Sequence, residues 1–168
     1  MSITIREAVN DDWPNCWAII EPVFAAGDTY PYEDLSQEEA RELWFDVPLK
    51  TYVAVDETLN VIGTYILKPN VTGRGDHVCN CGYIVDPKAR GKGVASAMCV
   101  HSQEQAVELG FLAMQFNFVV ASNEGAVRLW QKLGFEIIGT LPKVFRHASL
   151  GLVDAHIMFK ELTGLPVE

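Results

Sequence analysis

The sequence lacks a hydrophobic run of the roughly 18 to 20 residues that a membrane-spanning helix requires. Residues 1–9 also lack the apolar core and the cleavage site of a secretory leader. We therefore expect a cytoplasmic protein with no membrane partner. The chain has only four cysteines, Cys16, Cys79, Cys81 and Cys99, too few and too scattered for a secreted disulfide framework. We expect reduced thiols that are mostly buried.

Positive charge is also scarce, since 13 Lys and Arg oppose 22 Asp and Glu and give a net charge of −9. This balance is a poor match to a polyphosphate backbone, so we expect no nucleic-acid partner. One anionic ligand remains possible where N–H groups and cations gather locally. The 168 residues, 49% of them hydrophobic, fit one globular domain over residues 1–168 without repeats or linkers.

Hydrophobic periodicity and capping signals predict seven strands and four helices. The strands are expected at residues 2–8, 51–55, 61–67, 78–85, 112–119, 135–139 and 151–159. One helix begins near Trp13, with its end disturbed by Pro22, and a second runs from a capping box at Ser36 and Glu39 to about Asp46. The other two cover about 93–109 and 122–133. This order is α+β, with an antiparallel meander followed by a βαβ unit.

The segment 86–96, Asp-Pro-Lys-Ala-Arg-Gly-Lys-Gly-Val-Ala-Ser, is a glycine-bearing turn that leaves a strand and opens a helix. The first amides of a helix have no internal acceptors and carry partial positive charge, which favours a phosphate. Gly91 and Gly93 give access to the backbone, and Arg90 and Lys92 add charge. A plain basic turn is the alternative interpretation.

Two familiar phosphate motifs do not fit this turn. A Walker A loop requires Ser or Thr after Gly-Lys, where this chain has Gly93, and a glycine at the position of Pro87. A dinucleotide fingerprint is satisfied at Gly91 and Gly93, but its third glycine or alanine is replaced by Ser96. A nucleotide-binding redox domain therefore has little support.

The pattern Arg90-x-x-Gly93-x-Ala95 resembles the acetyl-coenzyme A motif of the GCN5-related N-acetyltransferase (GNAT) superfamily. The strand that ends in Tyr-Ile-Val-Asp-Pro before the turn and the segment 122–135, Ser-Asn-Glu-Gly-Ala through Leu-Gly-Phe, are also similar to that family and follow its order. The resemblance covers about residues 2–161. It implies a single GNAT-type domain with a central mixed sheet of about seven strands flanked by about four helices.

The resemblance further implies that acetyl-CoA is the co-substrate, without a metal. Its pyrophosphate would lie on the amides of the turn, and its pantetheine arm would pair with the strand before the turn while Asn123 holds it from the other side. A backbone N–H near Ile84 and Val85 would stabilise the negative charge on the acetyl carbonyl oxygen. The implied cofactor-binding residues are Tyr83, Ile84, Val85, Arg90, Gly91, Lys92, Gly93, Val94, Ala95, Ser96 and Asn123.

The chain departs from the family at two catalytic positions. Trp130 stands where the family usually has a tyrosine that protonates the departing thiolate, and indole does not ionise in a useful range. Either the enzyme works without that acid, with Trp130 in its place at the site, or Trp130 is core packing in an amphipathic helix. No glutamate ends the strand before Ser122, where some members place a base.

Asn80 and Asn117 are polar residues in otherwise apolar strands on either side of the expected cofactor gap. We expect them to order substrate or water, the alternative being that they satisfy backbone groups in the core.

A fainter resemblance, which includes Asn80, Asn117 and the segments 127–135 and 153–155, is to the fungal proline-analogue acetyltransferases. It favours a small-molecule amine or an amino acid as acceptor. By the same family logic Tyr30, Tyr32 and Glu33 would form the acceptor pocket, although Glu33 also fits a solvated surface charge. Homodimers are common in the family, and an exposed region at Trp13, Trp44 and Phe45 could supply the interface.

The sequence leaves the acceptor and other functions open. An acyl-CoA sensing module that has lost catalysis, or an acetyltransferase acting on a protein amine, stays possible because the acid and the base are missing. His77, Cys79 and Cys81 form the only metal-like cluster, but strand spacing puts its ends roughly 13 Å apart, too far for one zinc ion.

Overall fold

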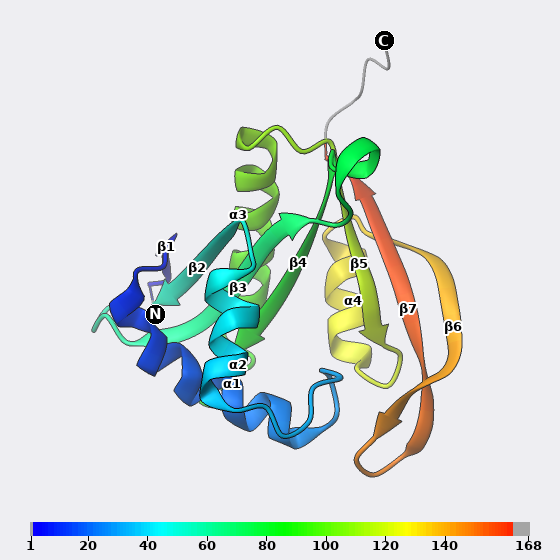
Figure 1. The fold of residues 1–168 in the computed structure, drawn as a ribbon, viewed down its shortest axis with the longest axis horizontal. Helices are drawn as coiled ribbons and strands as arrows, with labels where there is room; N and C mark the ends of the chain where they lie inside the picture. The colour runs from blue at the N-terminus through cyan, green and yellow to red at the C-terminus, as the bar shows by residue number, and fades with distance from the viewer. Residues whose placement is uncertain (1, 163–168) are drawn as a thin grey trace.

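The protein, described over residues 2–162 by a computed structural model, is a seven-stranded sheet in the order β1-β2-β3-β4-β5-β7-β6 (Figure 1). Residue 1 and residues 163–168 of the expected domain lie outside the described residues. The strands are β1 (Thr4–Glu7), β2 (Lys50–Val55), β3 (Val61–Pro69), β4 (Val78–Val85), β5 (Ala113–Val120), β6 (Glu136–His147) and β7 (Gly151–Glu161). The longer helices are α1 (Trp13–Ala26), α2 (Gln37–Arg41), α3 (Val94–Glu108) and α4 (Glu124–Lys132). The expected mixed α+β architecture is confirmed.

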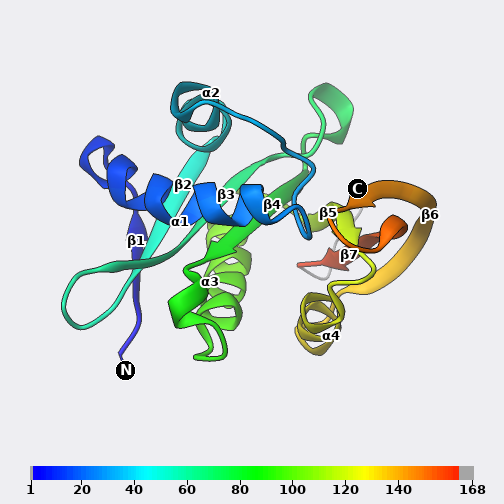
Figure 2. The same ribbon diagram turned by 90° about the horizontal axis from the view of Figure 1, so that it is seen from below.

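The sheet separates two hydrophobic cores. One contains the buried face of α1 together with Trp44, and the other contains α3, α4 and the opposite face of the sheet. Figure 2 shows α1 and α2 on one side of the sheet and α3 and α4 on the other. No helix among residues 2–162 is long and apolar enough to cross a membrane.

The expected capping box is confirmed, because the Ser36 backbone N–H donates to the Glu39 carboxylate at 2.8 Å and the Glu39 N–H donates to Ser36 Oγ at 3.2 Å. The helix continues beyond α2 as a π-helical turn over Glu42–Asp46. The helix α1 contains Pro22 and runs on to Ala26. The buried residues Val23 and Phe24 explain the continuation, since tertiary packing offsets the missing backbone hydrogen bond.

Two expectations are wrong. The closing strands β6 and β7 are longer than predicted, because bulges between Ile137 and Gly139 and between Leu141 and Phe145 break the alternating pattern without ending the pairing. Trp13 and Trp44 are 6% and 2% exposed, so they belong to the core and supply no exposed interface. The homodimer stays a prediction, and Trp13 and Trp44 do not form its interface.

The register of β4 and β5 positions the site. These parallel strands pair at Val78 with Ala113 and at Cys79 with Met114, whereas β4 continues to Val85 and β5 to Val120. The strands diverge after this short pairing, as Figure 1 shows. The expected βαβ unit, β4-α3-β5, is therefore present, and its two strands separate beyond Asn80.

Candidate active site

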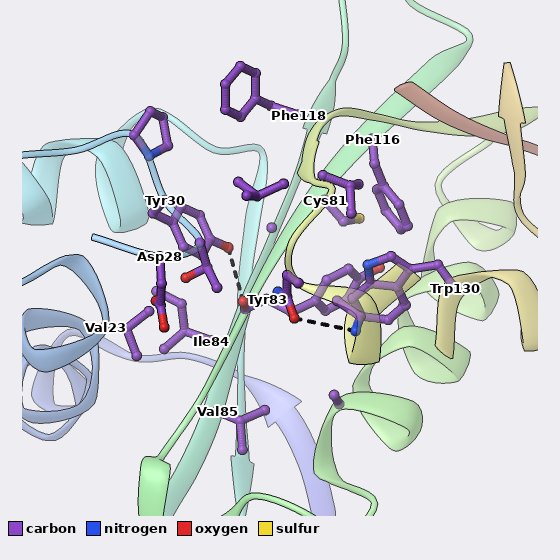
Figure 3. Close-up of a pocket in the computed structure, with 18 of the residues that line it drawn as sticks. Val23, Asp28, Tyr30, Cys81, Tyr83, Ile84, Val85, Phe116, Phe118 and Trp130 are labelled. Carbon is purple, nitrogen blue, oxygen red and sulfur yellow. Dashed lines mark hydrogen bonds between the residues drawn. The ribbon is translucent and has the colours of Figure 1, made fainter. Parts of the chain in front are cut away.

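A cleft of about 760 Å³ occupies the opening between β4 and β5. Its walls come from the α1–α2 loop, from β3, β4 and β5, from the start of α3, from α4 and from the end of β6. Figure 3 shows several of these side chains. Of the predicted cofactor-binding residues, those that line it are Tyr83, Ile84, Val85, Arg90, Gly91, Ala95 and Asn123. Lys92, Gly93, Val94 and Ser96 continue the adjoining turn and the start of α3.

The edge of β4 inside the cleft carries free backbone donors. The Asp86 N–H donates to the Ile62 carbonyl of β3 at 2.9 Å. Backbone groups of an antiparallel strand alternate in direction, so the N–H groups of Tyr83 and Val85 point away from β3, toward β5. Because β5 has diverged there, these donors face the cleft.

The N-terminus of α3 lies next to this edge and fits an anion. Gly93 precedes the helix with φ +82° and no side chain, and the Ala97 N–H donates to the Gly93 carbonyl at 2.9 Å. The three preceding helical amides therefore have no acceptor within the helix. Gly91 has φ +75°, and a Cβ added at either glycine would meet no described atom within 4 Å. With Arg90 and Lys92 exposed beside it, the turn favours a phosphate.

Trp130 serves both as core packing and as a wall of the cleft. Its side chain is 8% exposed, and its ring lies 5.1 Å from that of Tyr83 and 5.4 Å from that of Phe116. The Tyr83 hydroxyl is hydrogen-bonded with Ser102 Oγ of α3 at 2.7 Å. Burial raises the pKa of Tyr83 well above its ordinary value.

Both expected strand asparagines line the cleft, together with Asn123. Asn80 Nδ2 donates to the Gln115 carbonyl at 2.9 Å and so joins β4 to β5 just where they separate. Asn117 is exposed and donates from Nδ2 to Asn70 Oδ1 at 2.7 Å. Asn123 accepts from the Ala126 N–H at 3.4 Å and caps α4.

Of the three expected acceptor residues, two line the cleft and one does not. Tyr30 and Tyr32 line the cleft with their rings stacked 6.1 Å apart, and burial raises the pKa of both. Glu33 is exposed and is not part of the lining. The carboxylate that does line the cleft is Asp28, five residues earlier in the same loop.

Sequence reasoning missed five polar residues of the lining: Asp28, Thr29, Lys68, Ser122 and His147. A loop that contains Gly, Asp and Thr is typical of a solvated turn, so no local signal marked the first two. His147 lies at the end of β6, where its Nδ1 accepts from the Leu150 N–H at 3.2 Å. Residues 2–162 contain no group of three or more His, Cys, Asp or Glu that could hold a metal ion.

Comparison with known proteins agrees with this geometry. The family model described as "Acetyltransferase (GNAT) family" matches residues 5–135. The chain is 30% identical over 148 residues to N-acetyltransferase aca1 from Schizosaccharomyces pombe, covering 78% of this chain and 71% of the relative. The structure of a GCN5-related N-acetyltransferase from Kribbella flavida superimposes with a TM-score of 0.91 at 40% identity, covering 95% of this chain and 97% of the other.

A phosphinothricin acetyltransferase from Sinorhizobium meliloti, solved in complex with acetyl-CoA, shares the fold with a TM-score of 0.86 at 22% identity. That match covers 96% of this chain and 89% of the other. The open strand pair and the free helix N-terminus together define an acyltransferase fold, and the chain belongs to the GNAT acetyltransferase family. It is an N-acetyltransferase of that family.

Proposed function

We propose that this enzyme transfers the acetyl group of acetyl-CoA directly to the amine of a small molecule or an amino acid. The observation that carries the proposal is the single cleft that combines the unpaired edge of β4 with the uncapped N-terminus of α3. The extended pantetheine arm of acetyl-CoA, which carries amides, fits the unpaired edge of β4. Its pyrophosphate fits the N-terminus of α3. The acetyl-CoA complex of the Sinorhizobium meliloti protein, which shares the fold, supports this choice of co-substrate.

The proposed chemistry needs positioning more than side-chain catalysis. A neutral amine nitrogen attacks the thioester carbonyl carbon, the C–N bond forms, and the C–S bond breaks with its electron pair going to sulfur. The nitrogen loses one proton to water, and the thiolate takes one from water. The Tyr83 or Val85 N–H would donate to the carbonyl oxygen as negative charge develops there. Fixing the two reactants in one cleft supplies most of the rate.

Asn80 and Asn117 would hold the acceptor or a water that relays protons. Their side-chain amides lie on the two strands that flank the cleft, and each already has one partner that fixes its orientation. Asn80→Ala and Asn117→Ala are therefore expected to lower kcat or raise KM for the acceptor. Wild-type values of both constants in both variants would refute this role.

The activity is tested by thiol release from acetyl-CoA across a panel of primary amines, amino acids and cyclic secondary amines including proline analogues. Gly93→Glu is the blocked control, because its carboxylate would occupy and repel the phosphate position. Release that depends on an acceptor and disappears in Gly93→Glu is the expected result.

Tight acetyl-CoA binding without release across the panel would favour the alternatives, an acyl-CoA sensing module or an enzyme that acetylates a protein amine. The missing tyrosine acid at Trp130 is the observation that keeps the sensing module under test.

A further inference from the structure

Three buried side-chain atoms among residues 2–162 have no hydrogen-bond partner: Asp28 Oδ1, Thr29 Oγ1 and Ser122 Oγ. All three residues line the same cleft. Native proteins satisfy nearly all buried polar groups, so unpartnered oxygens gathered at one cleft indicate groups that a ligand completes. Two of them are consecutive residues on the acceptor side, in the loop between α1 and α2.

The backbone before Asp28 is fixed by contacts rather than free in solvent. Gly27 ends α1 with φ +62°, and its carbonyl accepts from the Ala148 N–H at 2.9 Å. A Cβ added at Gly27 would lie 3.2 Å from the Ala148 Cβ. The loop is thus held against the β6–β7 turn at a position that places Asp28 and Thr29 at the cleft.

The carboxylate of Asp28 is not paired with a cationic side chain within residues 2–162, although Lys68 and His147 line the same cleft. It takes part in none of the four ion pairs found within residues 2–162. An ionised carboxylate only accepts hydrogen bonds, and the half-buried Asp28 has its Oδ1 shielded from solvent, so pairing with a cation would stabilise it. The group that would satisfy it is a charged donor, and an ammonium is such a donor.

The neighbouring residues suit the same ligand. An ammonium has several N–H donors, so Thr29 Oγ1 can accept from the group that pairs with Asp28. The stacked rings of Tyr30 and Tyr32 add aromatic faces, which attract cations. Figure 3 shows Asp28 and Tyr30 on the α1 side of β4, across from Trp130 and Phe116.

We propose that Asp28 binds the acceptor amine as its ammonium ion, which then loses one proton to water to give the neutral nucleophile, and that this contact makes the enzyme select amines that are cationic in solution over neutral ones. The proposal rests on the proposed function and assigns its acceptor class. Asp28 is then a substrate-binding residue whose effect depends on the charge of the acceptor. Exposed Glu33 does not have this role.

The test compares a cationic with a neutral acceptor at pH 7.5, 2-phenylethylamine against aniline, in wild type and Asp28→Asn. Every other panel amine that the wild type acetylates is measured in the same way. For cationic amines, kcat/KM is expected to fall about 10- to 100-fold through KM, which corresponds to losing a hydrogen bond to a charged group. For neutral amines the expected change is under threefold. Acetyl-CoA affinity, measured by calorimetry, should not change.

Asp34→Asn is the matched control, since it removes a charge from the same loop at an exposed position. Asp34 has φ +52°, which asparagine tolerates, and wild-type kinetics are expected. Thermal unfolding supplies a second measurement. Because Asp28→Asn removes an unpartnered charge, the Tm of the free protein should stay the same or rise, whereas loss of a structural contact would lower it.

The inference is overturned if Asp28→Asn loses activity equally on cationic and neutral amines, loses none, or loses activity together with Tm. A wild type that acetylates neutral amines alone overturns it as well. A wild type that releases no thiol with any amine refutes the proposed function itself, and the inference with it.

Discussion

The Tyr30 hydroxyl donates a 3.0 Å hydrogen bond to the main-chain carbonyl of Tyr83, 53 residues further along the chain. This bond joins the α1–α2 loop to the edge of β4 that faces the cleft. Gly82 permits the close approach, since a Cβ there would lie 3.1 Å from Tyr30 Oη and 3.5 Å from the Trp44 ring. Burial raises the pKa of Tyr30, so its hydroxyl stays protonated and keeps donating. The acceptor side and the cofactor side of the cleft are thereby held in one arrangement.

Tyr30→Phe is expected to lower the free energy of unfolding by about 1 kcal/mol, because it removes a hydrogen bond to a partly buried carbonyl. Urea unfolding measures the change. Tyr32→Phe is the matched control, since the Tyr32 hydroxyl makes no hydrogen bond within residues 2–162, and its expected loss is smaller. Equal stability of the two variants would mean that the Tyr30–Tyr83 bond adds nothing.

Gly93→Ala should weaken acetyl-CoA binding about tenfold, because the new methyl group stands where the phosphate approaches the backbone. Gly110→Ala, at the other end of α3, is the control. Gly110 has φ +90° and open space like Gly93, so both variants should lose about 1–2 kcal/mol of stability from left-handed strain. Calorimetric titration should show weaker acetyl-CoA binding in Gly93→Ala alone. Equal acetyl-CoA affinities of the two variants would mean that the phosphate does not bind at this turn.

Trp130→Tyr is expected to change kcat by less than threefold relative to Trp130→Phe. If water protonates the thiolate, a phenol at this position gives no advantage. Both substitutions remove indole packing against Tyr83 and should cost about 1–2 kcal/mol of stability. A kcat at least tenfold higher for tyrosine than for phenylalanine would show that the enzyme does use an acid there.

The four cysteines should not react with a thiol reagent in the native protein at pH 8, and all four should react after denaturation. Each is free and buried, which confirms the sequence expectation. Burial raises the pKa of Cys16 to about 12 and also raises that of Cys99, so little reactive thiolate forms at pH 8. Thiol counting with and without guanidinium checks this. Rapid labelling of the native state would contradict it and would disturb the thiol-release assay.

The element order and the glycine turn at the start of α3 could be predicted from the sequence because their determinants are local. Ser36 with Glu39 caps α2 through contacts three residues apart, and Gly91 and Gly93 adopt positive φ where the helix begins. The lengths of β6 and β7 could not be predicted, since pairing between strands carries both through bulges. Core packing likewise keeps α1 intact beyond Pro22 as far as Ala26.

The sequence by itself determined the family, the order of strands and helices, and the turn from Arg90 to Ser96, since each depends on residues close together in the chain. The tertiary structure decided which loop residues reach the cleft. Asp28 lines it and Glu33 does not, because the Gly27–Ala148 and Tyr30–Tyr83 contacts fix the path of the loop. Both contacts join residues far apart in the sequence, and no local pattern specifies such contacts.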